Sequence, residues 1–439
     1  MPCTRAATAA IRHFALLVAL APGFAWLPAA AADAPLTLAE AQRRAVERSR
    51  LPAAQDAAAS AAREMAVAAG QLADPVAKLE INNLPVNGED AFSLTRDFMT
   101  MRSIGIMQEF TRAEKRQART ERFEREADKS RVEKSLAIAT IQRDTALAWL
   151  DRYYAEAMAA IVDEQRRAAA TEIEAAESAY RVGRGNLAEV LTAKSALFAL
   201  DDRADELKRR VHTAKIALAR WVGDEADAPL AGRPRIDAIA LDPHRLDADL
   251  AHHPDIAVLA SKEEIAAADV RIAQANKRTD WSIELMYSQR GPAYSNMISV
   301  SVSVPLQWDQ RNRQDRELAS KLAMLDQARA EREDMLRAHA AEVRAMIVEW
   351  ENNRERGVRY ARDLVPLASE RTQATLGAYR GAKAGIGDVL TARRNEIEVR
   401  MQALQLEMDT ARLWARLNFL VPDINMESPV ASTLTKEPL

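Results

Sequence analysis

The residues best suited to metal chemistry are two adjacent histidines and three closely spaced methionines. His252 and His253 carry imidazoles that bind metals, but adjacent residues on a helix point to different faces. We therefore expect the histidines to mark a solvated helix start rather than a metal site. Met99, Met101 and Met107, in "DFMTMRSIGIM", offer soft thioethers to copper or silver ions. Packing or loop positions explain these methionines better, so the sequence predicts no metal site.

Residue patterns that support catalysis or cofactor binding do not stand out either. Gly183 and Gly185, in "VGRGN", are not followed by the Lys-Ser/Thr of a phosphate-binding loop, and no strand pattern precedes them. Cys3 is the only cysteine, which excludes an internal disulfide or a cysteine-based metal site in the mature protein. No Ser/His/Asp arrangement or carboxylate pair stands out. We expect a protein that is not an enzyme and has no cofactor.

Charge and the N-terminal residues indicate an exported protein. The net charge of −3 over 439 residues gives no basic field for nucleic acid. Arg5 and Arg12 are followed by the apolar stretch "FALLVALAPGFAWL" and by small residues, which is the pattern of a secretory signal peptide. We predict a signal peptide over residues 1–32 that is cleaved after Ala32 and leaves no N-terminal cysteine for a lipid. The remainder has no apolar run long enough for a transmembrane helix.

Long stretches without helix breakers predict the elements that position the rest of the chain. Glycine and proline are absent from three stretches, which run from Ile106 to Val182, from Leu306 to Arg356 and from Asp388 to Val421. A helix as long as the first would reach roughly 100 Å. Composition alone favours a coiled coil or scaffold rod. The Arg- and Glu-rich stretch "TRAEKRQARTERFEREADKSR" predicts a solvated or intersubunit helix face.

The chain is also doubled. "AYRVGRGNLAEVLTAK" begins at Ala179 and "AYRGAKAGIGDVLTAR" begins at Ala378, and both place a glycine-containing break between long helices. Each break is typical of an αα-hairpin turn. We therefore divide the mature chain into four segments. These are a first repeat (33–222), a connector (223–253), a second repeat (254–421) and a flexible tail (422–439).

Each repeat also contains two candidate strands. Ile298, Val300, Val302 and Val304 alternate with serines, which predicts a strand with one apolar and one hydroxyl-lined face. In the matching segment of the first repeat, "RSIGIMQEF", Ile104 and Ile106 alternate with Ser103 and Gly105. The earlier candidates are "DPVAKLEI" and "DWSIELMY". These strands could form a small sheet packed on helices, or they could contribute to a closed barrel in the outer membrane. Four strands cannot close a barrel, so several chains would pool theirs.

The doubled order, the two hairpin turns and "SVPLQWDQRNRQ" resemble the TolC-like outer-membrane efflux factors. "MRSIGIMQEF", followed by "TRAEKRQAR", resembles their heavy-metal branch of the cobalt–zinc–cadmium and copper–silver type. The resemblance extends from about Pro35 to Val421. It implies a mainly α fold with a small transmembrane β part. The chain would form a homotrimer, in which each chain contributes four strands to one twelve-stranded barrel. Long helical hairpins would form a tunnel in the periplasm. It further implies docking on a periplasmic adaptor and an inner-membrane, proton-driven efflux pump.

The resemblance also implies which residues narrow and gate the tunnel. Asp388, in "GIGDVL", matches the family's acidic constriction residue, while Glu189 and Tyr379 match two sides of a gating link. The sequence departs from the drug-exporting pattern at Thr391, where a second acidic residue is expected, and at Ala382, where glycine is expected. The alternative is that both carboxylates only occupy the first turn of a helix, where the dipole favours them.

Two functions remain open from the sequence. In the first, the chain is a passive outer-membrane export duct, with heavy-metal cations as the expected substrates. In the second, it is a periplasmic coiled-coil scaffold or pump adaptor without a pore. An adaptor should carry compact all-β modules beside one helical hairpin, whereas this chain has two hairpins and two interrupted strand pairs. This pattern favours the duct.

Overall fold

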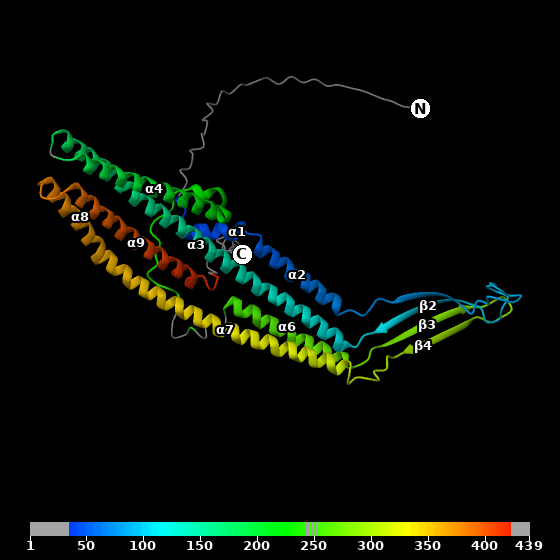
Figure 1. Cartoon of the computed structure of the whole chain (residues 1–439). Coiled ribbons are helices and arrows are strands. Elements are labelled where there is room, and N and C mark those ends of the chain that lie inside the picture. The colour runs from blue at the N-terminus through cyan, green and yellow to red at the C-terminus, as the bar shows by residue number, and fades with distance from the viewer. Residues whose placement is uncertain (1–34, 184, 242–245, 247–249, 251–252, 423–439) are drawn as a thin grey trace, which may run out of the picture.

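The computed structural model describes residues 35–183, 185–241, 246, 250 and 253–422. The predicted signal peptide, His252 and nearly all of the predicted tail lie outside these residues. The fold is a long bundle of helices with one small sheet at its end (Figure 1). Its helical elements are α1 (Leu38–Arg48), α2 (Leu51–Ala69), α3 (Ala113–Arg181), α4 (Leu187–Val222), the 3-10 turn η1 (Gly223–Asp227), α6 (Pro254–Asn276), α7 (Gln314–Arg359), the π turn η2 (Tyr360–Leu364), α8 (Val365–Arg380) and α9 (Ile386–Asn418).

The strands form one antiparallel sheet in the order β1-β2-β3-β4. They are β1 (Val76–Asn82), β2 (Met101–Phe110), β3 (Trp281–Gln289) and β4 (Met297–Ser303). All four predicted strands are therefore present, with small shifts of their ends. The prediction that Val304 belongs to the fourth strand is wrong. β4 ends at Ser303, and Val304 follows the last paired residue, just before Pro305. Proline cannot donate a ladder hydrogen bond, which is consistent with the strand ending here.

The longest helix follows from the absence of helix breakers. α3 contains 69 residues without glycine or proline, which at 1.5 Å per residue is about 100 Å. The breaker-free range extended further toward the N-terminus, but β2 occupies those residues up to Phe110. At the other end of α3, Gly183 adopts a positive φ of 68° in the hairpin turn to α4. The second hairpin turn, between α8 and α9, has Ala382 at a φ of 56°, a conformation that costs a non-glycine residue about 1 kcal/mol.

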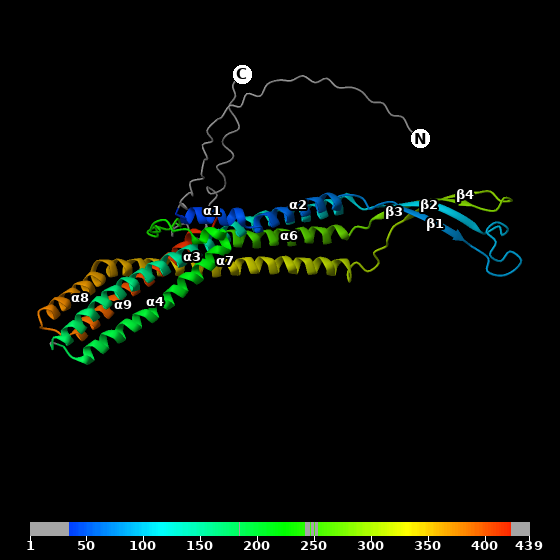
Figure 2. The ribbon, with the colours of Figure 1, turned by 90° about the horizontal axis from the view of Figure 1, so that it is seen from above.

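The second repeat is interrupted where the first is continuous. α7 passes through the π turn η2 into α8, whose first turn contains Pro366. Proline has no backbone N–H to donate and displaces the preceding turn, so a local change of hydrogen bonding is expected beside it. The α3 helix has no such break. Figure 2 shows that the helical part changes direction along its length.

The core of the helical part lies around the middle of α3. Trp149, Leu150 and Tyr154 are fully buried there against α1, α4 and α9. The indole Nε1 of Trp149 donates to the Leu36 carbonyl (3.1 Å), and the Tyr154 hydroxyl donates to Glu407 (3.2 Å). Both polar atoms of these large aromatic residues are thus satisfied inside the bundle, as buried polar groups require.

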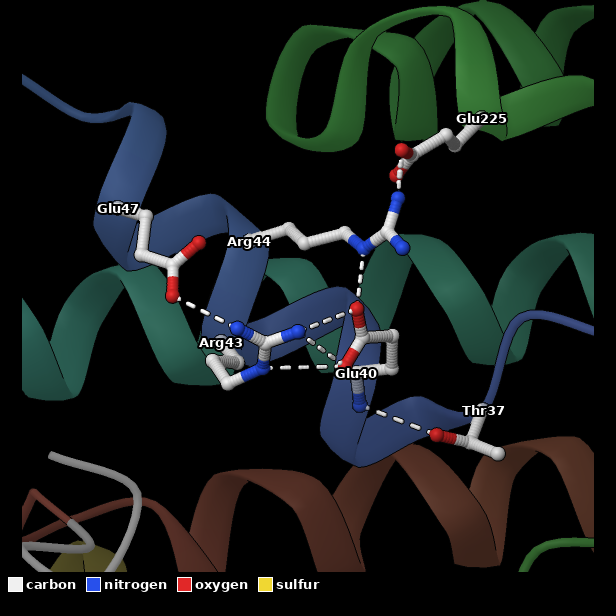
Figure 3. Close-up of polar contacts among 6 residues, drawn as sticks. All are labelled: Thr37, Glu40, Arg43, Arg44, Glu47 and Glu225. Atoms are coloured by element: carbon white, nitrogen blue, oxygen red, sulfur yellow. Dashed lines mark hydrogen bonds and ion pairs between the residues drawn. The ribbon is translucent and has the colours of Figure 1, made fainter. Parts of the chain in front are cut away.

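Charged side chains connect α1 to η1, the turn that follows α4 (Figure 3). Thr37 caps α1 by accepting a hydrogen bond from the Glu40 N–H (3.1 Å). Glu40 accepts from Arg43 and Arg44, and these hydrogen bonds hold the pKa of the Glu40 carboxyl below its usual value. Arg44 also forms an ion pair with Glu225 of η1. Arg44 therefore bridges the first helix of the described chain and the connector.

Candidate functional site

The sheet has one apolar face that no helix of the described residues covers. The register aligns Leu79, Ile104, Tyr287 and Ile298 in one row and Ala77, Ile106, Leu285 and Val300 in the next. Leu79 is 80% exposed and Ile298 is 72% exposed, although both are large aliphatic residues. Figure 1 shows that the sheet extends beyond the ends of the helices, so no helix of the described chain lies over its faces. An apolar surface of this kind marks an interaction with lipid or protein.

The opposite face of the sheet is polar. Lys78 forms an ion pair with Glu284 (2.5 Å), and the hydroxyls of Ser103 and Ser288 share a hydrogen bond (2.8 Å). Serines 299, 301 and 303 of β4 lie on this face too, as the alternation with the valines predicted. The structure therefore confirms the two-faced character of the strands, with the polar groups paired to each other on one side.

Both outer edges of the sheet are open in the described chain. β1 pairs only with β2, and β4 pairs only with β3. Their outward-facing backbone groups have no strand partner among the described residues, so both edges are available for pairing with a strand of another chain.

Aromatic side chains lie at both ends of the apolar face. At the end near the helices, Phe110 stacks on Trp281 with ring centroids 4.5 Å apart. At the loop end, Tyr287 accepts a hydrogen bond from Asn296 (2.8 Å), and Phe98 contacts Tyr294 with a centroid distance of 6.4 Å. Aromatic residues that flank an apolar band are typical of protein surfaces at membrane interfaces.

The predicted gating residues lie at the other end of the molecule, at the two hairpin turns. Glu189 is the third residue of α4, and its carboxylate and backbone N–H form a reciprocal capping box with Asn186. Asp388 holds the same position in α9, where its carboxylate accepts a hydrogen bond from the Gly385 N–H (3.1 Å). Both carboxylates thus stabilise helix starts, and Asp388 is in addition exposed to solvent.

Tyr379 packs at the same end but does not bond to Glu189. It contacts a small apolar cluster in which Ala176 and Val190 of the first hairpin meet Ile386 and Val389 of the second. No hydrogen bond joins Tyr379 to Glu189 among the described residues. The structure therefore brings the two hairpins together through apolar contacts at their tips, and the gating role of these residues stays a prediction.

Known structures share this arrangement of hairpins and sheet, although no family model and no curated protein sequence matches the chain. The outer-membrane channel OprN is 17% identical, with 88% of this chain and 90% of that chain aligned at a TM-score of 0.73. The outer membrane protein VceC from Vibrio cholerae is 19% identical, with 87% and 95% aligned at a TM-score of 0.69. CusC, described for its transmembrane channel formation, is 16% identical, with 87% and 91% aligned at 0.70.

The chain has the fold of the outer-membrane channels. These similar structures and the topology of the sheet confirm the predicted fold class, which is a mainly helical chain with a small four-stranded antiparallel sheet. Of these structures, OprN and CusC are described as channels. Within the described ranges, no helix combines the length and the hydropathy needed to cross a bilayer.

Within the outer-membrane channel fold, a buried polar link joins the two hairpins, and the sequence pattern gave no sign of it. Arg393 of α9 donates two hydrogen bonds to Glu172 of α3, one of them at 2.8 Å, and a third to Gln165 (3.1 Å). The side chains of Arg393 and Glu172 are only 15% and 8% exposed. The partners are 221 residues apart in sequence, so only the packing of the repeats brings them together.

His253 corrects one of our sequence predictions. It does begin a helix, because it is the N-cap of α6 and its Nδ1 accepts a hydrogen bond from the Asp255 N–H (3.3 Å). It is not solvated, however, since only 3% of the residue is exposed. Its ring lies against the ring of His339 of α7, at a centroid distance of 4.5 Å. The helix start is buried because α7 packs over it.

The Arg- and Glu-rich stretch of α3 is likewise less solvated than predicted. Lys115 is buried and pairs with Asp280 (2.8 Å), and Arg122 pairs with Asp269 of α6 (3.0 Å). These contacts hold α3 to the second repeat within one chain. Among the described residues, no group of three or more histidine, cysteine or acidic side chains could hold a metal ion.

Proposed function

We propose that this chain is the outer-membrane component of a tripartite efflux system, a passive duct for substrates delivered by other proteins. The observation that carries the proposal is the exposed, two-faced sheet with two open edges at one end of a long helical bundle. The similarity to outer-membrane channels supports it. The sheet would lie in the outer membrane and the helical hairpins in the periplasm.

The open edges favour a homotrimer. In lipid, every backbone polar group must be bonded, so a sheet can span a membrane only as a closed barrel. Four strands are too few, because transmembrane barrels begin at about eight. Three copies would supply twelve, with β1 of each copy pairing with β4 of the next. The apolar face, including Val300 and Val302, would then contact lipid, and the polar face would line the lumen.

The helical part supports the partners expected for such a duct. With about 100 Å in α3 alone, it is long enough to extend far into the periplasm. The tips of the two hairpins pack against each other through a shared apolar cluster. We expect the packed tips to form one compact surface for a periplasmic adaptor. We expect an inner-membrane, proton-driven pump to supply the energy for export.

Asp388 provides a test of the duct and of its narrow end. Three exposed Asp388 carboxylates around a threefold axis would form an acidic ring that attracts cations. We expect Asp388→Asn, which keeps an oxygen for the Gly385 N–H, to form pores whose preference for potassium over chloride is reduced. Single-channel recording in planar bilayers with a salt gradient measures this preference.

The matched control for this test is Glu189→Gln, the equivalent change at the start of α4. Glu189 is partly buried within its capping box and is expected to contribute less to the field in the tunnel. Pores of Asp388→Asn with unchanged selectivity would keep the duct and leave Asp388 as a helix-start residue only.

We propose further that the substrates are heavy-metal cations. The polar face of the sheet carries thioethers as well as hydroxyls and charges, because Met107, Met286 and Met297 lie on it. Met107 faces Glu284 and Met286 faces Ser299, so the three methionines occupy successive diagonal positions across β2, β3 and β4. Diagonal neighbours lie within reach of long side chains, and thioethers bind soft cations. Met99 lies in the loop before β2, as expected, whereas Met107 is neither a loop nor a core residue.

Silver ions provide a test of this substrate class. We expect micromolar Ag⁺ to reduce the potassium current of single pores, because transient thioether binding slows passage through the lumen. The double variant Met286→Leu, Met297→Leu keeps the volume of both side chains and should be several-fold less sensitive. Equal sensitivity of the variant and the wild type would refute the thioether contact while leaving the duct intact.

A further inference from the structure

The buried histidine pair at the start of α6 occupies a cavity that no part of the proposed duct requires. His253 and His339 line a cavity of about 700 Å³ between α3, α6, α7 and the end of α9. His253 is almost fully buried, and the side chain of His339 is 13% exposed. The Nε2 atom of His339 is buried without a hydrogen-bond partner among the described residues. Two titratable rings are thus packed together away from water.

The hydrogen bond at the helix start requires His253 to be neutral. Its Nδ1 accepts from the Asp255 N–H, and an imidazolium has no lone pair left for this bond. Protonation would therefore remove the N-cap of α6. It would also place a positive charge at the N-terminus of a helix, where the dipole is positive.

The surrounding charges only partly offset this cost. Asp255 of α6 approaches His253 Nδ1 at 3.6 Å and Glu342 of α7 approaches His339 Nδ1 at 4.0 Å, but these carboxylates are 50% and 68% exposed. On α3, Arg143 is paired with Asp144 (2.9 Å), and Arg416 of α9 also lines the cavity. The cavity therefore holds two cationic arginines besides the two histidines.

Burial is the largest cause that lowers the pKa of His253, followed by the nearby His339, while Asp255 and the Leu420 carbonyl act in the opposite direction. A histidine whose folded-state pKa lies below its unfolded value of about 6.5 stabilises the folded state fully above that pH. This stability is lost as the pH falls from about 6.5 toward the folded-state pKa. Acid thus favours any conformation in which the ring leaves the cavity.

We propose that His253 and His339 form an acid-sensitive latch that fastens the start of α6 to α7. At neutral pH the uncharged His253 ring packs against the His339 ring and caps α6. Below about pH 6.5, opening of this joint takes up a proton and is favoured. Because α6 leads to β3 within the same chain, the latch controls the joint between the helical bundle and the helix that carries the third strand. The latch does not depend on the substrate of the duct.

Hydrogen–deuterium exchange of the full mature chain in detergent tests the latch, with rates corrected for the intrinsic pH dependence of exchange. One proton taken up on opening changes the protection about tenfold per pH unit below the unfolded pKa. From pH 7.5 to 5.5 we therefore expect a loss of protection of up to about tenfold for the amides of residues 255–259. Amides around Tyr154, in the core of α3, serve as the internal reference.

Two variants distinguish the latch from general acid loosening. His253→Asn keeps an N-cap side chain without a titratable group, so its α6 start should keep the same protection at both pH values. His339→Phe keeps a ring against His253 and should respond less than the wild type. A pH-independent wild type, a full response in His253→Asn, or an undiminished response in His339→Phe would each overturn the proposal.

Discussion

Val300→Lys is expected to prevent assembly of the channel in the outer membrane. Val300 is 67% exposed in the middle of the apolar face, where it pairs with Leu285. A lysine on the lipid face near the bilayer midplane costs about 2–4 kcal/mol, and a trimer would contain three of them, about 6–12 kcal/mol in total. The yield of trimer in outer-membrane fractions, followed by gel migration of unheated samples, measures the effect.

Ser299→Lys is the matched control, because Ser299 is the adjacent residue of β4 and lies on the polar face opposite Met286. We expect this variant to assemble at close to the wild-type yield, since its lysine would reach water in the lumen. Equal yields for Val300→Lys and Ser299→Lys would contradict the assignment of the two faces. Loss of assembly only for Ser299→Lys would reverse it.

Arg393→Met is expected to destabilise the helical bundle strongly. Without Arg393, the Glu172 carboxylate remains buried and loses its cationic partner, and one of its oxygens, Oε2, already has no hydrogen-bond partner among the described residues. Removing one member of a buried ion pair costs about 3–5 kcal/mol. For a chain of this size we expect the midpoint of thermal unfolding in detergent to fall by on the order of 5 °C.

Two further variants show whether the cost comes from the unpaired charge. Adding Glu172→Gln to Arg393→Met removes that charge and should recover most of the lost stability. Arg394→Met changes the next residue, whose side chain is exposed, and should change stability by less than about 0.5 kcal/mol. A similar loss for Arg393→Met and Arg394→Met would show that the buried link does not stabilise the hairpins.

The strands and long helices were predictable because each depends on a local pattern. The alternation of Ile298, Val300 and Val302 with serines survives in the structure, since a strand with two different surroundings must separate the two residue types. In the same way, the absence of glycine and proline over α3 left a helix as the simplest conformation for an alanine-rich segment. Only the ends of the predicted elements differ in the structure. At Val304, for example, the hydrogen bonding between strands rather than the periodicity determines where β4 ends.

The polar links between the repeats were not predictable from the same patterns. Arg393 and Glu172 resemble any solvated arginine and glutamate of a helix, and only packing across 221 residues buries them. The burial of His253 likewise depends on His339 of another helix. For Glu189 and Asp388, the helix-start geometry was one of the two predicted alternatives, and it is present. A single chain does not contain the threefold arrangement on which the constriction depends.

Single-channel recording of the purified wild-type chain in planar bilayers tests the proposed duct most directly. We expect stable, long-lived, cation-preferring pores that appear with the trimer and are absent from preparations of Val300→Lys. A chain that remains soluble without detergent, never inserts and carries no current would contradict the duct. The two-faced sheet would then belong to a periplasmic scaffold.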